Sequence, residues 1–389
     1  MMPKPPLHGR RIHIAGSIAD DLEIASTGEV KAALSFVAAL VVDLMRKGAT
    51  FVVPVDADKR RPGDYLPICF DWLIWEMLSA NLAGRPSGAP NPLAVAVQHH
   101  KTEDQIADDK YDLWDSLRGS ELVSIDNASH WNMASKRMEM QALHGDILIT
   151  LGGSEGVLFL ANLYHQAGKP VIPLNYRLCA NDTGSRKLFN HALTSQETAR
   201  FFRVEGQVAP HDWINRLNFS HRHDVSYRVA QVVGLLESLE RPIVFAVRLL
   251  DSKADLFQEV EDFFTGVVKH VVENELGYTL KIVDGRQAYE HSRIDAEIFN
   301  KLHHSSVVVA DITGSRANCF IELGYALGRS IPMMMTARDG TQFPFDVGTL
   351  PGHPWDPSLS LEDRQRKFLA YWKANINRPP LVPPEPLVP

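Results

Sequence analysis

The sequence predicts an α/β protein with two Rossmann-like domains in tandem, each built on a doubly wound, mostly parallel sheet. Its 389 residues are enough for two domains of ordinary size. Short apolar runs alternate with helical patterns along most of the chain, which is typical of parallel strands joined by helices. The pattern breaks at Glu240, Arg241 and Pro242, and a second alternating set then begins.

The first set of elements precedes that break. Helical periodicity predicts a long apolar helix at residues 30–46, and another apolar helix follows the strand that ends at Leu151. Residues 176–240 are expected to hold loops and two helices, the second at 227–239. Trp72 and Trp75 fall on one helical face and are expected to pack in the core or at an interface. Apolar runs predict the strands at residues 11–16, 49–55, 93–97, 146–151 and 170–174.

The second set has the same order of strand, turn and helix. Strands are expected at residues 243–247, 279–283, 307–310 and 331–335, with helices at 256–276, 294–303 and 320–327. The domains are expected at 11–240 and 241–375. Residues 1–10 are expected to form a flexible leader, and 376–389 a proline-rich, extended tail.

The composition disfavours several classes of function. A formal net charge of −7 gives no reason to expect nucleic-acid binding, which needs clustered basic residues. The cysteines and histidines lack the spacing of metal ligands, so neither a disulfide framework, a metal nor a cofactor is expected. No signal peptide and no run of about 18 apolar residues is seen, so a cytoplasmic protein without a membrane partner is expected.

A glycine-rich turn lies between the strand at 146–151 and the following helix. It comprises Gly152, Gly153, Ser154, Glu155 and Gly156. Glycines let a backbone approach a ligand closely, and a helix N-terminus favours an anion. The turn is therefore either an anion site or a tight strand-to-helix connection without a ligand.

The residues upstream of this turn favour a ligand. Met133, the basic pair Lys136 and Arg137, and Met138 precede the segment DILITLGG. This arrangement resembles the lysine-decarboxylase-like and cytokinin-riboside phosphoribohydrolase families, which belong to the wider group of SLOG domains. The resemblance covers roughly residues 10–200. It implies that Gly16, Ser17 and residues 152–156 contact phosphate or ribose, and that Lys136 and Arg137 contact a nucleotide.

The sequence departs from those families at one functional position. The phosphoribohydrolases carry a Gly-Thr pair with a catalytic Glu three residues after the Thr, whereas this chain has Gly156 and Val157 with Leu160 at the matching place. Leucine cannot stabilise an oxocarbenium-like transition state. Glu155 lies inside the turn and does not match. The first domain is therefore expected to bind a nucleotide-derived signal without cleaving it.

A second candidate site follows the strand at 307–310. That strand ends at Asp311, and after a short turn the helix at 319–327 carries Glu322 in an otherwise apolar stretch. A buried carboxylate is costly unless it is paired or used, although the helix dipole offsets part of the cost. The structural alternative is that Asp311 caps the helix and Glu322 bonds nearby backbone amides.

The string ADITGSRANCFIELGYALGRSIPMMM resembles the nucleoside 2-deoxyribosyltransferase-like family, and TIR-like NAD hydrolases share a related layout. The resemblance spans roughly residues 242–350. It implies that Glu322 attacks the anomeric carbon, that Asp311 holds the ribose or assists proton transfer, and that Asn318 binds a sugar hydroxyl or orients Glu322. Gly314 and Ser315 would receive a phosphate. Arg248 is expected either to face this site or to be a surface arginine.

Together these features predict a signal-regulated N-glycosidase. The first domain would sense a nucleotide-derived ligand, and the second would cleave a nucleotide, nucleoside or NAD, with an anti-phage or stress role and a homo-oligomeric state implied by resemblance. Two alternatives stay open. One is a nucleotide-binding regulator without catalysis, and the other is an unregulated hydrolase of nucleotide salvage or clean-up.

Overall fold

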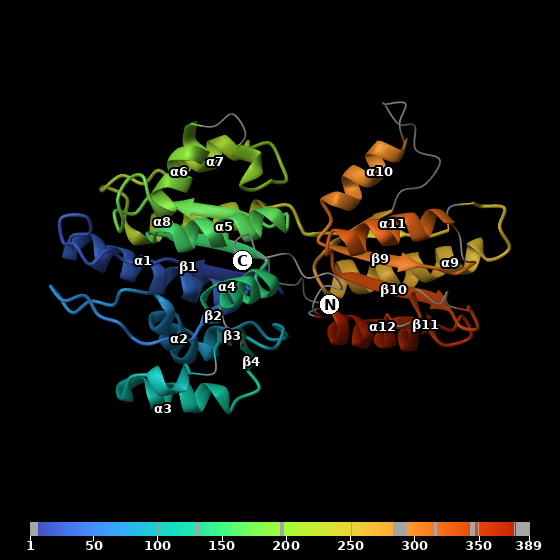
Figure 1. The fold of residues 1–389 in the computed structure, drawn as a ribbon, viewed down its shortest axis with the longest axis horizontal. Helices are drawn as coiled ribbons and strands as arrows, with labels where there is room; N and C mark the ends of the chain where they lie inside the picture. Colours follow the sequence, from blue (N-terminus) through green and yellow to red (C-terminus); the bar gives the residue numbers. More distant parts are fainter. Residues whose placement is uncertain are drawn as a thin grey trace. The chain divides into compact units, whose positions relative to one another are not determined.

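The chain divides into two compact units, Met1–Glu240 and Arg241–Pro389. The structure, a computed structural model, describes residues 7–99, 101–128, 133–194, 198–249, 251–282, 294–314, 317–342, 347–348, 350–376 and 378. Each unit holds one sheet whose described strands all run parallel (Figure 1). The predicted fold class, two Rossmann-like α/β domains, is confirmed.

The sheet of the first unit has the order β4-β3-β2-β1-β5-β6. Five of its strands coincide with predicted apolar runs; β4 was not expected. Its side chains are half-buried or exposed, none of them buried, and it lies at the edge of the sheet, so it lacks an apolar run. The strands are β1 Arg11–Ala15, β2 Thr50–Pro54, β3 Ala94–Gln98, β4 Val123–Asn127, β5 Ile147–Leu151 and β6 Val171–Leu174.

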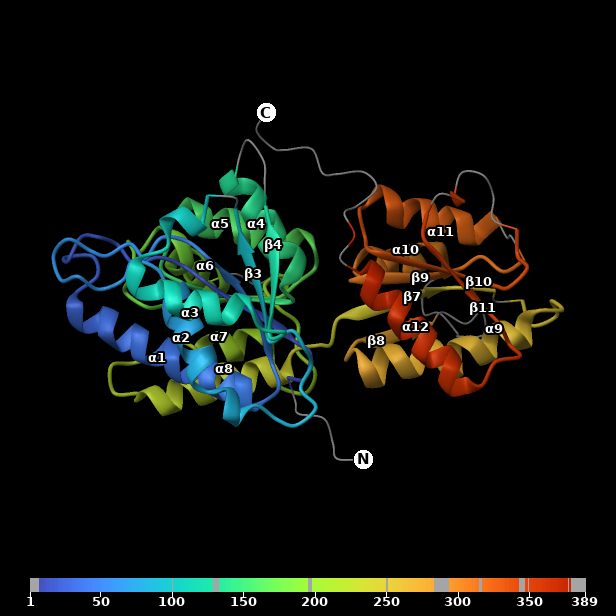
Figure 2. The same cartoon turned by 90° about the horizontal axis from the view of Figure 1, so that it is seen from below.

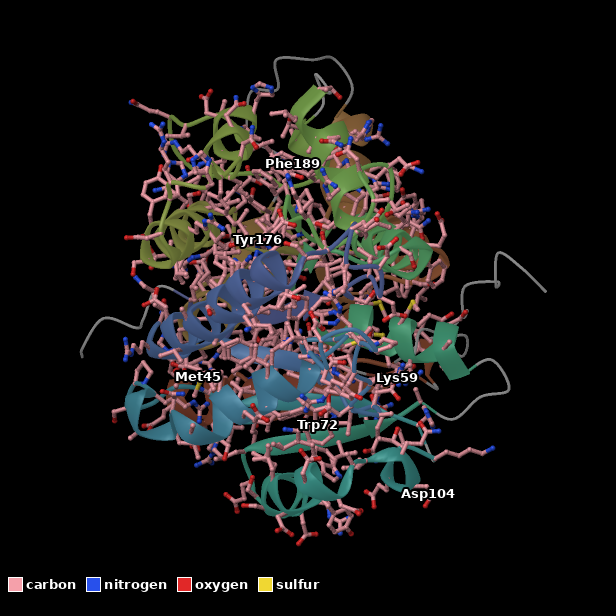
Figure 3. The ribbon with its side chains drawn as sticks, turned by 90° about the vertical axis from the view of Figure 1, so that its left-hand side faces the viewer. Met45, Lys59, Trp72, Asp104, Tyr176 and Phe189 are labelled. Atoms are coloured by element: carbon pink, nitrogen blue, oxygen red, sulfur yellow. The ribbon has the colours of Figure 1, made fainter. Side chains whose placement is uncertain are left out.

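The helix α1, Thr27–Arg46, is capped at its N-terminus by Ser26, whose hydroxyl accepts a hydrogen bond from the Glu29 amide. The helix α2, Asp71–Ala80, carries the predicted tryptophan face. Trp72, labelled in Figure 3, and Trp75 are buried. Their indole nitrogens donate to the carbonyls of Asp56 and Pro54, at 2.8 and 3.1 Å. The tryptophans therefore pack in the core. The next helices are α3 Asp108–Arg118, α4 Met133–His144 and α5 Glu155–Gln166.

Residues 176–240 contain three α-helices among the described residues, so the expectation of two was wrong. These are α6 Gly184–Thr194, α7 Pro210–Arg216 and α8 Val225–Ser238. The short α7 has only seven residues, which is too few to show a helical period. Its first residue is a proline, which is favoured there because that position needs no amide hydrogen.

The sheet of the second unit has the order β11-β10-β9-β7-β8. Its strands are β7 Ile243–Val247, β8 Thr279–Ile282, β9 Val307–Asp311, β10 Met333–Arg338 and β11 Gly352–Trp355. The edge strand β11 was not expected, because its sequence Gly-His-Pro-Trp contains no apolar run. The helix α12, Leu361–Asn375, was also missed.

Helices cover both faces of this second sheet (Figures 1 and 2). On one face lie α10, Ile294–His303, and α11, Ala317–Gly328; on the other lie α9, Phe257–Phe263, and α12. The predicted helix at 256–276 is α9 followed by two π-helical segments, Phe264–Val268 and His270–Glu275. None of the helices in the described ranges is long and apolar enough to span a membrane.

Candidate functional site

The strand order reverses at one place in each sheet, between β1 and β5 in the first unit and between β7 and β9 in the second. In open parallel sheets, ligands bind outside the carboxyl ends of the strands at such a switch point. The segments singled out in the sequence follow these strands. Gly16 and Ser17 come after β1, the glycine-rich turn after β5, Arg248 after β7, and the turn at 312–314 after β9.

The two turns of the first unit pack backbone against backbone. The Gly153 amide donates to the Ser17 carbonyl at 2.7 Å. A Cβ on Gly16 would lie 1.7 Å from the Leu151 carbonyl oxygen, and one on Gly152 would lie 2.2 Å from that of Ser17. Gly152 also has a φ of +65°. These glycines are needed first for the close approach of the two strand ends, which shapes the floor of the candidate site.

The start of α5 presents the polar groups of the turn. Ser154 and Glu155 are exposed, and the Ser154 side chain makes no capping hydrogen bond. Within the described ranges, the amides of Glu155 and Gly156 have no hydrogen-bond acceptor. Unpaired amides at the N-terminus of a twelve-residue helix suit an anionic group of a ligand.

A Gly152→Ala variant tests how tightly this turn is built. We expect it to lower the free energy of unfolding by about 3 kcal/mol, because a left-handed φ and an overpacked Cβ act together. Gly168→Ala is the matched control, since Gly168 has a φ of +67° but no atom within 4 Å of an added Cβ. Its cost should be about 1 kcal/mol. Equal losses in urea unfolding would show that the contact with Ser17 contributes nothing.

Arg137 extends from α4 to a residue after β2, whereas Lys136 pairs with a residue of its own helix. The Arg137 guanidinium lies 2.7 Å from the Asp56 carboxylate, just after β2, whereas Lys136 lies 3.2 Å from Glu139 on its own helix. The next residue, Met138, is 3.4 Å from the position of a Cβ on Gly156, so α4 packs directly on the glycine-rich turn. The helix that carries Arg137 therefore packs on the turn, while the Arg137 guanidinium itself contacts Asp56.

Two carboxylates beside Arg137 were missed in the sequence. Asp56 follows β2, and Asp71 begins α2. Burial raises the pKa of Asp71 to about 7; the Arg137 charge opposes the rise and the Asp56 charge adds to it. The position of Asp56 directly after a buried strand was the signal that could have found it. Leu160, which stands where the phosphoribohydrolases carry a catalytic Glu, is buried in the core.

In the second unit, Asp311 is fully buried and its carboxylate accepts hydrogen bonds from three of the described residues. The donors are the Thr313 amide at 3.0 Å, the Thr336 hydroxyl at 2.8 Å and the Trp355 indole nitrogen at 2.8 Å. Burial raises the pKa of Asp311, although these donors oppose the rise. None of the three donors belongs to α11, so the described contacts join the ends of β9, β10 and β11.

Arg248 is also buried, with 7% of its surface exposed, so it is not a plain surface arginine. Its guanidinium forms an ion pair with Glu261 on α9 and lies 5.6 Å from the centre of the Phe264 ring. Both contacts are on the face of the sheet that α9 and α12 cover.

Glu322 occupies the second turn of α11 and is half-buried. Burial raises its pKa from the ordinary value of 4.5 to about 7. No hydrogen bond or ion pair reaches it from the residues that the structure describes. Asn318 and Gly314 are exposed at the start of α11 and in the preceding turn, and Ser315 lies outside the described residues.

The predicted residues of the second unit thus fall into two groups. Side chains alternate along a strand, and Val307 and Val309 of β9 pack with α9 and α12, so Asp311 points to that face. Val308 and Ala310 pack with α10 and α11. Asp311 and Arg248 therefore face α9 and α12, whereas Glu322 and Asn318 belong to the helix on the opposite face. No group of three or more potential metal ligands occurs in the described part of the chain.

Comparison with known proteins bears on the first unit. A family model described as "ATP nucleosidase Cap17-like, N-terminal" matches residues 7–236, which is more than half of the chain. A search of curated proteins gave no match. The chain is also similar to the solved X-ray structure titled TM1055, a structural genomics target, with 13% identity over 49% of this chain and 88% of that one, and a TM-score of 0.28.

Proposed function

The chain belongs to the family of Cap17-like ATP nucleosidase N-terminal domains, and from this membership we propose that it is a nucleotide N-glycosidase. The substrate class is a nucleotide, nucleoside or NAD, and the bond cleaved joins the base to the sugar. The observation that carries the catalytic assignment is Glu322, a half-buried carboxylate with no partner among the described residues. Such a group is costly to keep unless it is used.

Glu322 acts as the nucleophile in this proposal. A carboxylate oxygen forms a bond to the anomeric carbon while the bond to the base breaks, and the electron pair goes to the base nitrogen, which takes up a proton from solvent unless the base was already cationic, as in NAD. Water then attacks the same carbon and restores the carboxylate. Stabilisation of a free glycosyl cation by the same carboxylate is the variant of this step without a covalent intermediate. Asn318 orients the sugar or Glu322, and Gly314 and Ser315 receive a phosphate.

Asp311 takes a different role from the one that the resemblance implies. Its carboxylate already accepts three hydrogen bonds and faces α9 and α12. We assign it as a positioning residue that holds the turn after β9, on which Gly314 lies. Arg248 supports the same end of the sheet through Glu261.

The first unit binds the regulatory ligand, a nucleotide-derived anion. Its support is the switch point between β1 and β5, the unpaired amides at the start of α5, and Arg137 beside Asp56. Ligand binding can activate the second unit only if the ligand binds the active arrangement better than the idle one. A homo-oligomer and an anti-phage or stress role complete the proposal, and both rest on the resemblance to nucleotide-signal effectors.

The pH dependence of base release tests the role of Glu322. A nucleophile must be ionised, and the folded-state pKa of Glu322 is about 7. We therefore expect kcat/KM to fall about tenfold per pH unit below pH 7 and to level off above it. A profile that rises toward low pH would instead assign Glu322 as a general acid. Rates should be measured from pH 5 to pH 9 by chromatography of the free base.

A second candidate places catalysis in the first unit. The family match falls on that unit, and Asp56, after β2, and Asp71, at the start of α2, stand beside Arg137. On this alternative Asp71→Asn abolishes base release and Glu322→Gln leaves it intact. The proposal made here predicts the reverse when both variants are assayed with saturating signal ligand.

A further inference from the structure

A cavity of about 240 Å³ lies in the second unit at the ends of β10 and β11, against α12. It is smaller than the roughly 300–1,000 Å³ typical of sites for drug-sized ligands. A molecule with about the size of an amino acid fits within this volume, whereas a nucleotide would extend beyond it. Of the lining elements, α12 covers the face of the sheet opposite α11. The cavity is therefore separate from the helix that carries Glu322.

The cavity brings together charges of both signs. Arg364 and Lys367 come from α12, and no ion-pair partner exists for either within the described ranges. Asp339 and Asp356 follow β10 and β11, and each gives one carboxylate oxygen to a nearby backbone amide, of Gly340 at 3.0 Å and of Ser358 at 2.8 Å. Asp339 therefore keeps a second oxygen that can accept from a ligand, whereas Asp356 also interacts with the Ser358 side chain and with the Lys367 charge.

The other polar and aromatic residues that line the cavity add no charge to its two cations and two carboxylates. Burial, with the nearby Lys367 charge, lowers the pKa of His353 to about 4, so the imidazole is uncharged at neutral pH. Trp355 is 1% exposed and closes the base of the cavity rather than offering a stacking surface. The charged lining is then two cations and two carboxylates, which complements a ligand with one positive and one negative end.

A chain of hydrogen bonds joins this cavity to the turn after β9. The Trp355 indole donates to Asp311 at 2.8 Å, and the Trp355 carbonyl accepts from the Asp339 amide at 2.8 Å. The amide of Arg338, next to Asp339, donates to the Thr313 hydroxyl at 2.8 Å. Asp356 and Asp339 are the sequence neighbours of Trp355 and Arg338, which donate hydrogen bonds to Asp311 and Thr313. A ligand that contacts these two aspartates therefore acts on the residues that hold the turn after β9.

We propose that this cavity binds a small zwitterion with separated ammonium and carboxylate groups, and that occupancy stiffens the turn after β9. The carboxylate lies toward Arg364 and Lys367, and the ammonium toward Asp339 and Asp356. Any consequence for catalysis rests on the proposed function, because that turn carries Gly314. Binding and stiffening themselves do not depend on it.

Titration calorimetry of the full chain with 5-aminopentanoate tests the site. Pentanoate and pentylamine are the matched probes that each lack one charge. We expect saturable binding of the zwitterion, and at least about tenfold weaker binding of either single-charge probe, because each loses charged hydrogen bonds. Absence of saturable binding, or equal affinity for pentanoate, overturns the proposal.

Two variants locate the binding. Lys367→Met should weaken it at least about tenfold, whereas Lys373→Met, an exposed lysine on the same helix outside the cavity, should not change it. Equal effects of the two variants overturn the assignment to this cavity. Hydrogen exchange of the segment containing Thr313 should slow at saturation, and an unchanged rate overturns the link to β9. None of these readouts uses base release, so they fail or succeed separately from the N-glycosidase proposal.

Discussion

Replacing Glu322 by Gln should reduce base release about a thousand-fold or more, which is the scale for loss of a catalytic nucleophile. The amide has nearly the same shape as the carboxylate but cannot attack the anomeric carbon. Glu362→Gln is the matched control, because Glu362 is an exposed residue near the start of α12 in the same unit. Chromatography of the free base, with and without signal ligand, measures both variants. Full activity in Glu322→Gln would remove Glu322 from the mechanism.

The pH dependence of the stability of Glu322→Gln tests whether the pKa of Glu322 is raised in the folded state. The pKa of Glu322 is about 7 in the folded state against an ordinary value of 4.5, so between these values the folded state keeps a proton that the unfolded state has lost. The wild-type group therefore lowers stability as pH rises through this window. Glutamine has no such dependence. We expect the melting temperature of Glu322→Gln relative to wild type to rise from pH 4.5 to pH 7 and to stay constant above it.

Replacing Asp311 by Ala should destabilise the second unit by about 2–5 kcal/mol, because buried donors on Thr313, Thr336 and Trp355 lose their acceptor. Part of this loss is offset, since burial of the carboxylate is itself unfavourable and raises its pKa. Asp262→Ala is the matched control, because Asp262 is exposed and accepts a single bond from Gln258. Its effect should stay within about 0.5 kcal/mol.

Urea unfolding followed by hydrogen exchange of peptides from each unit separates the two responses. The first unit serves as the internal reference, since Asp311 belongs to the second. A loss below 1 kcal/mol in the second unit would show that the three bonds around Asp311 contribute little. Asp311 would then be free for a direct role at the substrate.

The apolar centres of both sheets were predictable from sequence. Every residue of β5 and β9 is buried, and strands with both faces covered read as continuous apolar runs. The edge strands β4 and β11 were not, because neither Val-Ser-Ile-Asp-Asn nor Gly-His-Pro-Trp contains a continuous apolar run. The helix α12 was missed because Phe368, Trp372 and Asn375 are its buried residues, and the rest of the stretch is rich in charge.

The candidate residues were predictable individually but not in their grouping. A sequence motif shows that Asp311 and Glu322 are near one another along the chain, but a change of strand face separates their side chains. Two of the three partners of Asp311 are 25 and 44 residues away, at Thr336 and Trp355, and no local sequence pattern indicates them. Asp56 and Asp71 were missed for a similar reason, since Arg137, the cation beside them, comes from a distant helix.

The most direct test of the account is release of free base by the purified protein, followed by chromatography with NAD and a panel of nucleotides and deoxynucleotides. Each substrate is assayed alone and with cyclic nucleotides or cyclic ADP-ribose as signals. We predict base release that requires a signal. Release without any signal would contradict regulation, and no release under any condition, with ligand binding still measurable, would contradict the N-glycosidase assignment and leave a nucleotide-binding regulator.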